Sequence, residues 1–189
     1  TGHLVVSTIH TNSAAGAIPR FLSMGVKPFL LAPALNAVIG QRLVRRLCVD
    51  CKVDATLSPS QQEEVRRVLG SISPKSGVHV DLAKLAFKGP GPGCKTCNNM
   101  GYKGRLGIYE IFTMTKEIEQ EVLSKEVSEF MIQDMAIKGG MLTMAQDGLL
   151  KALQGFTSVE EILSVVTIDS TLIEPPVLES PAPAPKEEV

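Results

Sequence analysis

The sequence predicts an α/β fold built from a strand-and-helix start, a segment that carries all the cysteines, and a C-terminal group of helices. Three observations support this prediction. Residues 3–9 are β-branched and apolar with little alternation, which is typical of a strand buried on both faces of a sheet. Residues 48–97 contain two Cys-x-x-Cys pairs. Residues 113–170 repeat apolar side chains at helical spacing.

The first block, residues 1–47, is expected to continue from this strand into two helices and a second strand. Helical spacing of apolar residues predicts a helix over 13–24, which Gly25 ends. The apolar run over 29–39 predicts a second helix. Imperfect alternation of polar and apolar residues over 41–47 predicts the strand that closes the block.

The second block, residues 48–112, is expected to form a cysteine-bearing subdomain with a return strand. Ser58 is a favourable N-cap, followed by Pro in the first turn, and it predicts a helix over 59–69. The best strand pattern of the block covers 105–112. The helix therefore lies inside the long segment that separates the two cysteine pairs.

The third block, residues 113–170, is expected to be a bundle of three to four short helices, because glycines separate its apolar stretches. Residues 171–189 hold five of the twelve prolines and show neither a helical nor a strand period. That composition predicts a disordered, Pro-rich tail. The functional alternative for the tail is a docking peptide.

Composition and charge exclude several classes of protein. The 19 basic and 20 acidic residues give a net charge of −1, which argues against a surface devoted to nucleic acid or membrane. The longest apolar run, 29–40, is much shorter than the roughly 20 residues that a membrane-spanning helix needs. No signal peptide is visible, and the chain opens on Thr1 just before a strand pattern. We therefore expect a fragment of a longer protein.

The cysteines form the most specific motif in the sequence. Cys48 and Cys51 make one pair, and Cys94 and Cys97 make the other. A two-residue gap lets both thiolates of a pair reach one ion, and two pairs complete the four-sulfur shell of a structural zinc site. The alternatives are two disulfides, which would suit an oxidising compartment, or four free core cysteines. A zinc hydrolase is excluded because all four ligands are cysteines.

His10 is the first candidate for a functional histidine. It lies at the end of the expected strand, together with Thr8, Thr11 and Asn12. Ligands of open α/β sheets bind beyond the carboxyl ends of the strands. His10 could therefore contact a phosphate or orient a water. The alternative is that His10 satisfies a backbone carbonyl while Asn12 caps the next helix. The sequence contains no GxxxxGK[ST] phosphate-binding loop.

Five basic residues flank the two cysteine pairs. Arg42, Arg45 and Arg46 precede the first pair, and Lys103 and Arg105 follow the second. A shared zinc ion would bring these segments together. The charges could then contact nucleic acid, nucleotide phosphates or an acidic subunit surface, or they could form only a solvated rim around the knuckle.

Residues 1–12, TGHLVVSTIHTN, closely resemble the histidine box of the bacterial ATPases that drive type II secretion and type IV pilus assembly (GspE/PilB type). The resemblance continues in the right order to about residue 166. Its further pieces are Met24-Gly25, Gln41-Arg42-Leu43, Arg46-Leu47-Cys48, Gly93–Cys97, Gly101–Arg105, Gly107–Glu110, Gly140-Met141, Asp147-Gly148, Gly155-Phe156-Thr157 and Glu160-Glu161.

The resemblance implies a partial RecA-like P-loop ATPase domain with a zinc knuckle and a helical C-terminal part. It implies a ring hexamer at the inner face of the plasma membrane that uses ATP and Mg²⁺, acts on an inner-membrane platform protein, and does not bind nucleic acid directly. By resemblance, His10 lies near the γ-phosphate of ATP, and His3 belongs to the same catalytic box. Arg42 is the candidate for a nucleotide contact, and the cysteines favour the assembly branch.

The chain departs from the family pattern in one respect. In the family, the phosphate-binding loop and the acidic motifs that support Mg²⁺ precede the histidine box, and this sequence begins at that box. We therefore expect a C-terminal part that does not hydrolyse ATP alone. The alternative from another class is a free-standing zinc-ribbon module that binds protein or nucleic acid.

Overall fold

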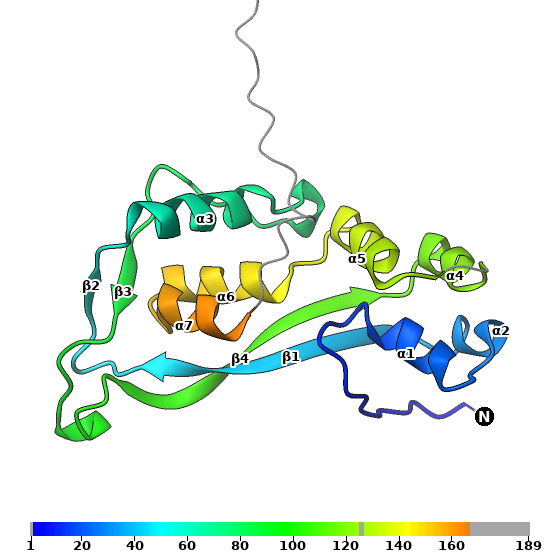
Figure 1. The fold of residues 1–189 in the computed structure, drawn as a ribbon, viewed down its shortest axis with the longest axis horizontal. Helices are drawn as coiled ribbons and strands as arrows, with labels where there is room; N and C mark the ends of the chain where they lie inside the picture. The colour runs from blue at the N-terminus through cyan, green and yellow to red at the C-terminus, as the bar shows by residue number, and fades with distance from the viewer. Residues whose placement is uncertain (1, 125–126, 167–189) are drawn as a thin grey trace, which may run out of the picture.

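The computed structural model describes residues 2–124 and 127–166. Its central feature is a long antiparallel ribbon of two strands, β1 (Ala37–Leu47) and β4 (Tyr102–Thr113), which runs through the whole molecule (Figure 1). Helices pack against the ribbon along its length, and the loops that carry the cysteines lie at the far end of β1 from the N-terminal segment.

Alternation along the ribbon separates a buried face from an exposed face. On β4, Ile108, Glu110 and Phe112 are buried, whereas Tyr109 and Ile111 between them are exposed. A charged residue therefore occupies one position of the buried face. The exposed face carries the large apolar side chains Ile39, Leu43, Tyr109 and Ile111.

The first of two hydrophobic cores, the cysteine-side core, covers the half of the ribbon nearer the cysteines. In it α6 (Met144–Leu153) lies between α3 (Pro59–Gly70) and the ribbon, and α7 (Val159–Val165) packs against β1 (Figure 1). A short antiparallel pair, β2 (Val53–Ala55) and β3 (Phe87–Gly89), closes its outer end. The fully buried side chains of this core include Val65, Ile108, Leu149 and Ile162.

The second core, the N-terminal-side core, covers the other half of the ribbon. It is built from α1 (Ala17–Ser23), α2 (Pro28–Leu31), α4 (Lys116–Val122) and α5 (Glu129–Lys138). Its fully buried side chains include Ile18, Ile118, Val122 and Ile132. Two single-turn 3₁₀ helices, η1 (Pro74–Ser76) and η2 (Lys95–Cys97), complete the described elements.

Hydroxyl side chains cap five of the helices and explain where these helices begin. Ser58 and Thr143 form complete capping boxes with Gln61 and Gln146 at the starts of α3 and α6. At the starts of α4, α5 and α7, the side chain of the N-cap residue accepts a hydrogen bond from a first-turn backbone N–H. These N-cap residues are Thr115, Ser128 and Ser158.

The strand predicted over residues 3–9 is wrong. These residues adopt no regular structure, and the side chains of Leu4, Val5 and Val6 are 85%, 77% and 88% exposed. A strand buried on both faces needs hydrogen-bonded neighbours and a layer on each side. Among the described residues, β1 and β4 pair only with each other, so residues 3–9 have no strand to join.

The helix predicted over 29–39 is also largely wrong. Helix α2 ends at Leu31, and β1 already begins at Ala37. Pro33 has no backbone N–H to continue the helix and restricts the residue before it, so the chain turns there. The helix predicted over 59–69 and the strands predicted over 41–47 and 105–112 are confirmed as parts of longer elements.

Residues 113–124 and 127–166 contain four helices, within the three to four expected, but these helices do not form one bundle. Helices α4 and α5 pack on each other in the N-terminal-side core, while α6 and α7 pack on each other in the cysteine-side core. Helix α6 also packs against α3 and the ribbon. The predicted tail, 171–189, lies outside the described residues. Across residues 2–124 and 127–166, every helix is too short or too polar to cross a membrane.

Candidate functional site

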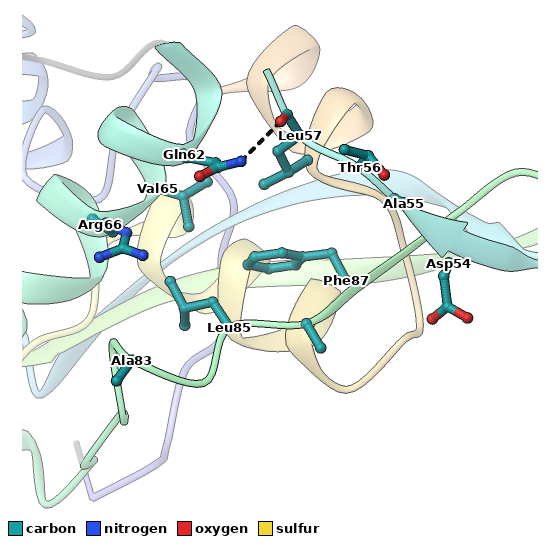
Figure 2. Close-up of a pocket in the computed structure, with 11 residues that line it drawn as sticks. Asp54, Ala55, Thr56, Leu57, Gln62, Val65, Arg66, Ala83, Leu85 and Phe87 are labelled. Carbon is teal, nitrogen blue, oxygen red and sulfur yellow. Dashed lines mark hydrogen bonds between the residues drawn. The ribbon is translucent and has the colours of Figure 1, made fainter. Parts of the chain in front are cut away.

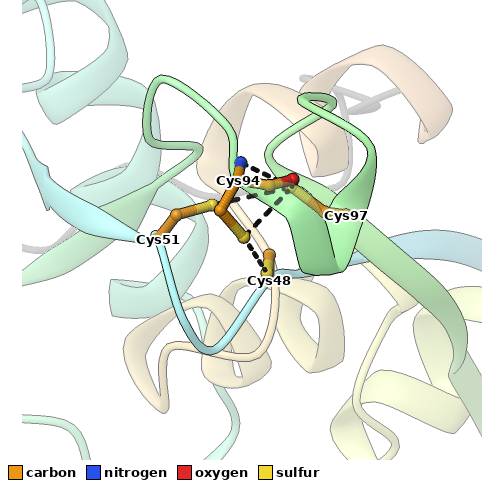
Figure 3. Close-up of side chains that lie close together, drawn as sticks. All are labelled: Cys48, Cys51, Cys94 and Cys97. Atoms are coloured by element: carbon orange, nitrogen blue, oxygen red, sulfur yellow. Dashed lines mark hydrogen bonds between the residues drawn. The ribbon is translucent and has the colours of Figure 1, made fainter.

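The four cysteines meet at the end of the ribbon, where two loops face each other (Figure 3). The Sγ atoms of Cys48 and Cys94, of Cys51 and Cys97, and of Cys94 and Cys97 lie 3.7 Å apart, and all four lie within 4.8 Å of one another. A tetrahedral zinc with Zn–S bonds of about 2.3 Å requires sulfur atoms about 3.8 Å apart. The spacing therefore fits a single metal ion held by four thiolates.

The disulfide alternative does not fit this geometry. A disulfide bond is about 2.05 Å long, and all four cysteines are free. Backbone hydrogen bonds hold the two loops in shape. The N–H of Cys48 donates to the carbonyl oxygen of Gly101 at 3.0 Å, and the N–H of Cys97 donates to the carbonyl oxygen of Cys94 at 3.2 Å. Gly101 has φ +73°, and a Cβ there would lie 2.8 Å from Pro90, so only glycine fits.

The loops also prepare one thiol for ionisation. Burial raises the pKa of Cys97, but backbone N–H groups of Cys94 and Gly101, each 3.3 Å from its Sγ, outweigh burial and lower that pKa to about 6. For Cys51, burial and hydrogen bonds to the other thiols raise the pKa to about 12. The site thus offers one ready thiolate, and a bound cation would stabilise the ionised form of the others.

Hydrogen bonds join the cysteine loops to the turn between α6 and α7. Lys52, which follows Cys51, donates from Nζ to the carbonyl of Gly155 at 2.9 Å. The N–H of Leu47, just before Cys48, donates to the carbonyl of Phe156, also at 2.9 Å. The base of the candidate metal site is therefore attached directly to the C-terminal helices.

A second set of contacts extends this attachment into α7. Glu161, 6% exposed, accepts hydrogen bonds from the backbone N–H and the guanidinium of Arg45, whose guanidinium also lies 4.3 Å from the ring centre of Tyr102. The Tyr102 hydroxyl in turn hydrogen-bonds Ser158 at 2.8 Å. Burial raises the pKa of Glu161, but the hydrogen bonds and the charge of Arg45 outweigh it and hold that pKa below its usual value.

The other predicted site residues lie elsewhere on the ribbon. His3 and His10 are exposed on the N-terminal segment, which lies apart from the loops that carry the cysteines (Figure 1). Arg42 donates from its guanidinium to the carbonyl of Asn12 at 3.4 Å, so the structure brings this arginine beside the segment that carries His10. The structure therefore joins Arg42 to the histidine segment and places both apart from the cysteines.

Of the five basic residues that flank the cysteine pairs, the three arginines that precede the first pair make separate contacts. Arg42 faces Asn12, whereas Arg45 pairs with Glu161. Arg46 lies with its guanidinium 5.7 Å from the ring centre of Phe156. Each of these arginines therefore contacts a different partner along β1, and the three do not form a shared phosphate-binding patch.

Two features escaped the sequence analysis. One is the buried carboxylate of Glu110. Its signal was present, because Glu110 lies in phase with the apolar Ile108 and Phe112. The other is a pocket of about 380 Å³ between α3 and the β2–β3 pair, for which the sequence offers no motif. Figure 2 shows its apolar floor and the hydrogen bond from Gln62 to the carbonyl of Leu57. Its main apolar lining residues are Leu57, Val65, Leu85 and Phe87.

The fold and site together define a small mixed helix-and-strand unit whose four clustered cysteines could hold a metal ion. Residues 1–164 match the family described as "Type II/IV secretion system protein". The chain therefore belongs to this family, and the resemblance drawn from the sequence is confirmed.

Curated relatives agree with this assignment. The chain is 44% identical over 165 residues to the type IV pilus assembly ATPase PilB of Thermus thermophilus, covering 87% of this chain and 17% of that protein. It is 42% identical over 165 residues to PilB of Pseudomonas aeruginosa, covering 86% and 26%. It is 39% identical over 165 residues to type II secretion system protein E of Pectobacterium carotovorum, covering 87% and 30%. The chain thus spans less than a third of the length of these relatives.

Proposed function

We propose that this chain is the C-terminal part of a cytoplasmic, hexameric motor ATPase that powers type IV pilus assembly or type II protein secretion by hydrolysing ATP. The observation that carries the proposal is the family match over residues 1–164, supported by relatives whose names describe pilus-assembly and secretion ATPases. In this proposal the motor works peripherally at the inner face of the plasma membrane, on an inner-membrane platform protein.

The alternative of a free-standing zinc-ribbon module is less favoured. The family match is not confined to the cysteine segment but includes the histidine segment and the C-terminal helices. The proposal keeps the division expected from the sequence: the end of an ATPase core in residues 1–47, a metal-binding subdomain in 48–112 and a helical part in 113–170. In the proposed motor, His10 and His3 serve catalysis, and Arg42 contacts the nucleotide.

We propose zinc as the metal of the cysteine site. Four thiolates at tetrahedral spacing suit zinc, and they leave no ligand position for a water molecule. The metal is therefore structural, and the chemistry of ATP hydrolysis belongs to the nucleotide-binding part of the motor. The sequence contains no GxxxxGK[ST] loop to hold the phosphates of ATP, so we expect the chain alone to show no turnover above background.

A chimera tests the proposed function. The T. thermophilus relative, with its 165 matching residues replaced by those of this chain, should still hydrolyse ATP. In this chimera, His10→Ala should lower kcat by about tenfold or more and leave KM for ATP nearly unchanged, as expected for a group that acts on the transition state. His79→Ala, a change at the other exposed histidine outside the box, is the matched control. A folded chimera without turnover, or equal effects of the two changes, would contradict the proposal.

A further inference from the structure

Four segments of the chain meet at Glu110, in the middle of the ribbon. Glu110 is paired with Gly40 across the two strands, and it is 5% exposed. One carboxylate oxygen accepts a hydrogen bond from the N–H of Ala14, just before α1, at 2.5 Å. The other accepts from the N–H of Met144, the first residue of α6, at 3.4 Å. Glu110 therefore contacts the N-terminal-side core and the cysteine-side core with one side chain.

The absence of a side chain at Gly40 makes this meeting possible. A Cβ at Gly40 would lie 2.7 Å from the Cε of Met144, 2.9 Å from the Cγ of Glu110 and 3.1 Å from the backbone nitrogen of Ala14. Ala14 and Met144 are also the two residues whose backbone N–H groups donate to the carboxylate. A larger residue opposite Glu110 would displace the Met144 and Glu110 side chains and press on the backbone of Ala14, so glycine permits the close approach at this position.

Three contacts attach the residues that follow His10 to the rest of the fold. Arg42 donates to the carbonyl of Asn12, the Ser13 hydroxyl donates to Glu129, and the N–H of Ala14 donates to Glu110. The side chains of Arg42 and Glu129 are exposed, whereas that of Glu110 is buried. The contact to Glu110 is therefore the one that water competes with least.

We infer that Glu110 is a positioning residue for the His10–Asn12 segment. By accepting the N–H of Ala14 while it is fixed against the start of α6, the carboxylate sets where this segment lies relative to β1 and Arg42. Both oxygens are used, because one accepts from Ala14 in the segment before α1 and the other accepts from Met144 at the start of α6. The importance of this placement for ATP turnover rests on the proposed function; the placement itself does not.

Glu110→Gln is the matching perturbation because it keeps size and shape. A glutamine has one acceptor oxygen, and its amide NH₂ would face one of the two N–H donors, so one hydrogen bond is lost. Glu161→Gln is the matched control: Glu161 is buried to the same degree and accepts backbone and side-chain hydrogen bonds, but from Arg45 on the cysteine side. Both variants lose stability, and only Glu110→Gln should affect the histidine segment.

Amide hydrogen exchange on the 189-residue chain decides the placement. After correction for the change in global stability, Glu110→Gln should speed exchange at Ala14 or Met144 by about tenfold, while Glu161→Gln leaves both amides unchanged. Unchanged exchange at both amides in Glu110→Gln, or the same acceleration in both variants, would overturn the inference.

Turnover in the chimera separates this inference from the proposed function. If His10→Ala and Glu110→Gln both lower kcat with KM for ATP within about twofold of the parent, the positioning role in catalysis is supported. If His10→Ala lowers kcat and Glu110→Gln does not, the positioning role in catalysis is overturned while the proposed function stands. If neither lowers kcat, the proposed role of His10 fails, and the exchange measurement alone decides whether Glu110 places the segment.

Discussion

The two halves of the ribbon show how one residue type can stabilise a fold in two ways. On the cysteine side, Glu161 pairs with Arg45, and both belong to a network that joins the cysteine loops to α7. Near the middle, Glu110 accepts hydrogen bonds from two backbone N–H groups of different cores and has no cationic hydrogen-bond partner in residues 2–124 and 127–166. The first carboxylate stabilises one half internally, while the second connects the halves.

The halves also differ in what completes them. The cysteine-side core ends at four thiols with metal-site spacing, attached through Lys52 and Leu47 to the turn between α6 and α7. The N-terminal-side core ends at a segment whose residues 4–6 are exposed and apolar. A structural ion could supply much of the stability of the first half, whereas the second depends on the packing of its helices against the ribbon.

Loss of one of the four cysteines should lower the stability of the cysteine side more than any other change considered for either side. Cys94→Ser should lower the free energy of unfolding by about 4 kcal/mol or more, because it removes a metal ligand and exposes the cysteine side to local unfolding. The loosening should spread to α6 and α7, since these helices are hydrogen-bonded to the cysteine loops. Hydrogen exchange with and without chelator measures it.

Thr96→Ser, in the same turn but not a ligand, is the control for that change. If exchange in α1 and α5 accelerated as much as in α6 and α7, the two sides would not be separate stability units. If α6 and α7 stayed fully protected, the contacts through Lys52 and Leu47 would not transmit the loss of the ligand.

Cavity-forming changes should separate the two cores next. Leu149 and Ile132 are both completely buried, one in each core. Leu149→Ala and Ile132→Ala should each cost about 2–5 kcal/mol. Denaturant unfolding measures the cost, and exchange shows its location: Leu149→Ala should loosen α3 and α7, and Ile132→Ala should loosen α1 and α4. Identical exchange patterns for the two variants would mean that the molecule has one cooperative core.

The features that the sequence predicted correctly are those with local signals, and the features that it missed depend on residues far apart in the chain. The helix 59–69 and the strand 105–112 were predictable because capping and alternation are local signals. The clustering of the four cysteines was predictable because two Cys-x-x-Cys pairs are typical of a shared metal site. The strand over residues 3–9 failed because burial on both faces depends on distant partners. Glu110 was visible only as a charge in the buried phase of β4, and its partners come from residues far along the chain.

The pH dependence of the free energy of unfolding should distinguish the two buried carboxylates. Its effect should be smaller, about 1.4 kcal/mol for each pKa unit by which the folded and unfolded chains differ. Burial raises the pKa of Glu110, although hydrogen bonds from the N–H groups of Ala14 and Met144 oppose this rise. The contribution of Glu110 to stability is therefore present below the pKa of the unfolded chain, about 4.3, and is lost as pH rises through the pKa of the folded chain. The lowered pKa of Glu161 gives a contribution present above about 4.3 and lost as pH falls through the folded pKa.

Urea unfolding at a series of pH values measures both contributions. Glu161→Gln should remove part of the loss of stability in acid, and Glu110→Gln should remove part of the decline above pH about 4.3. The opposite assignment of the two slopes would show that the environments of the carboxylates have been misjudged.

Removal of a helix cap should have the smallest effect. Ser128→Ala at α5 and Thr143→Ala at α6 each remove a side-chain acceptor for a first-turn N–H, and each should cost about 1 kcal/mol. Thermal unfolding compares them. If only Thr143→Ala cost much more than this, the start of α6 would contribute more to the contact with Glu110 than the loss of a helix cap explains.

The contrast between the two sides depends most directly on the metal ion proposed for Cys48, Cys51, Cys94 and Cys97. Elemental analysis of the chain purified without chelator measures this ion. One zinc per chain in the parent, and clearly less than one in Cys94→Ser, is the expected result. A parent protein that is folded and contains no metal, whether its cysteines are free or oxidised, would contradict it.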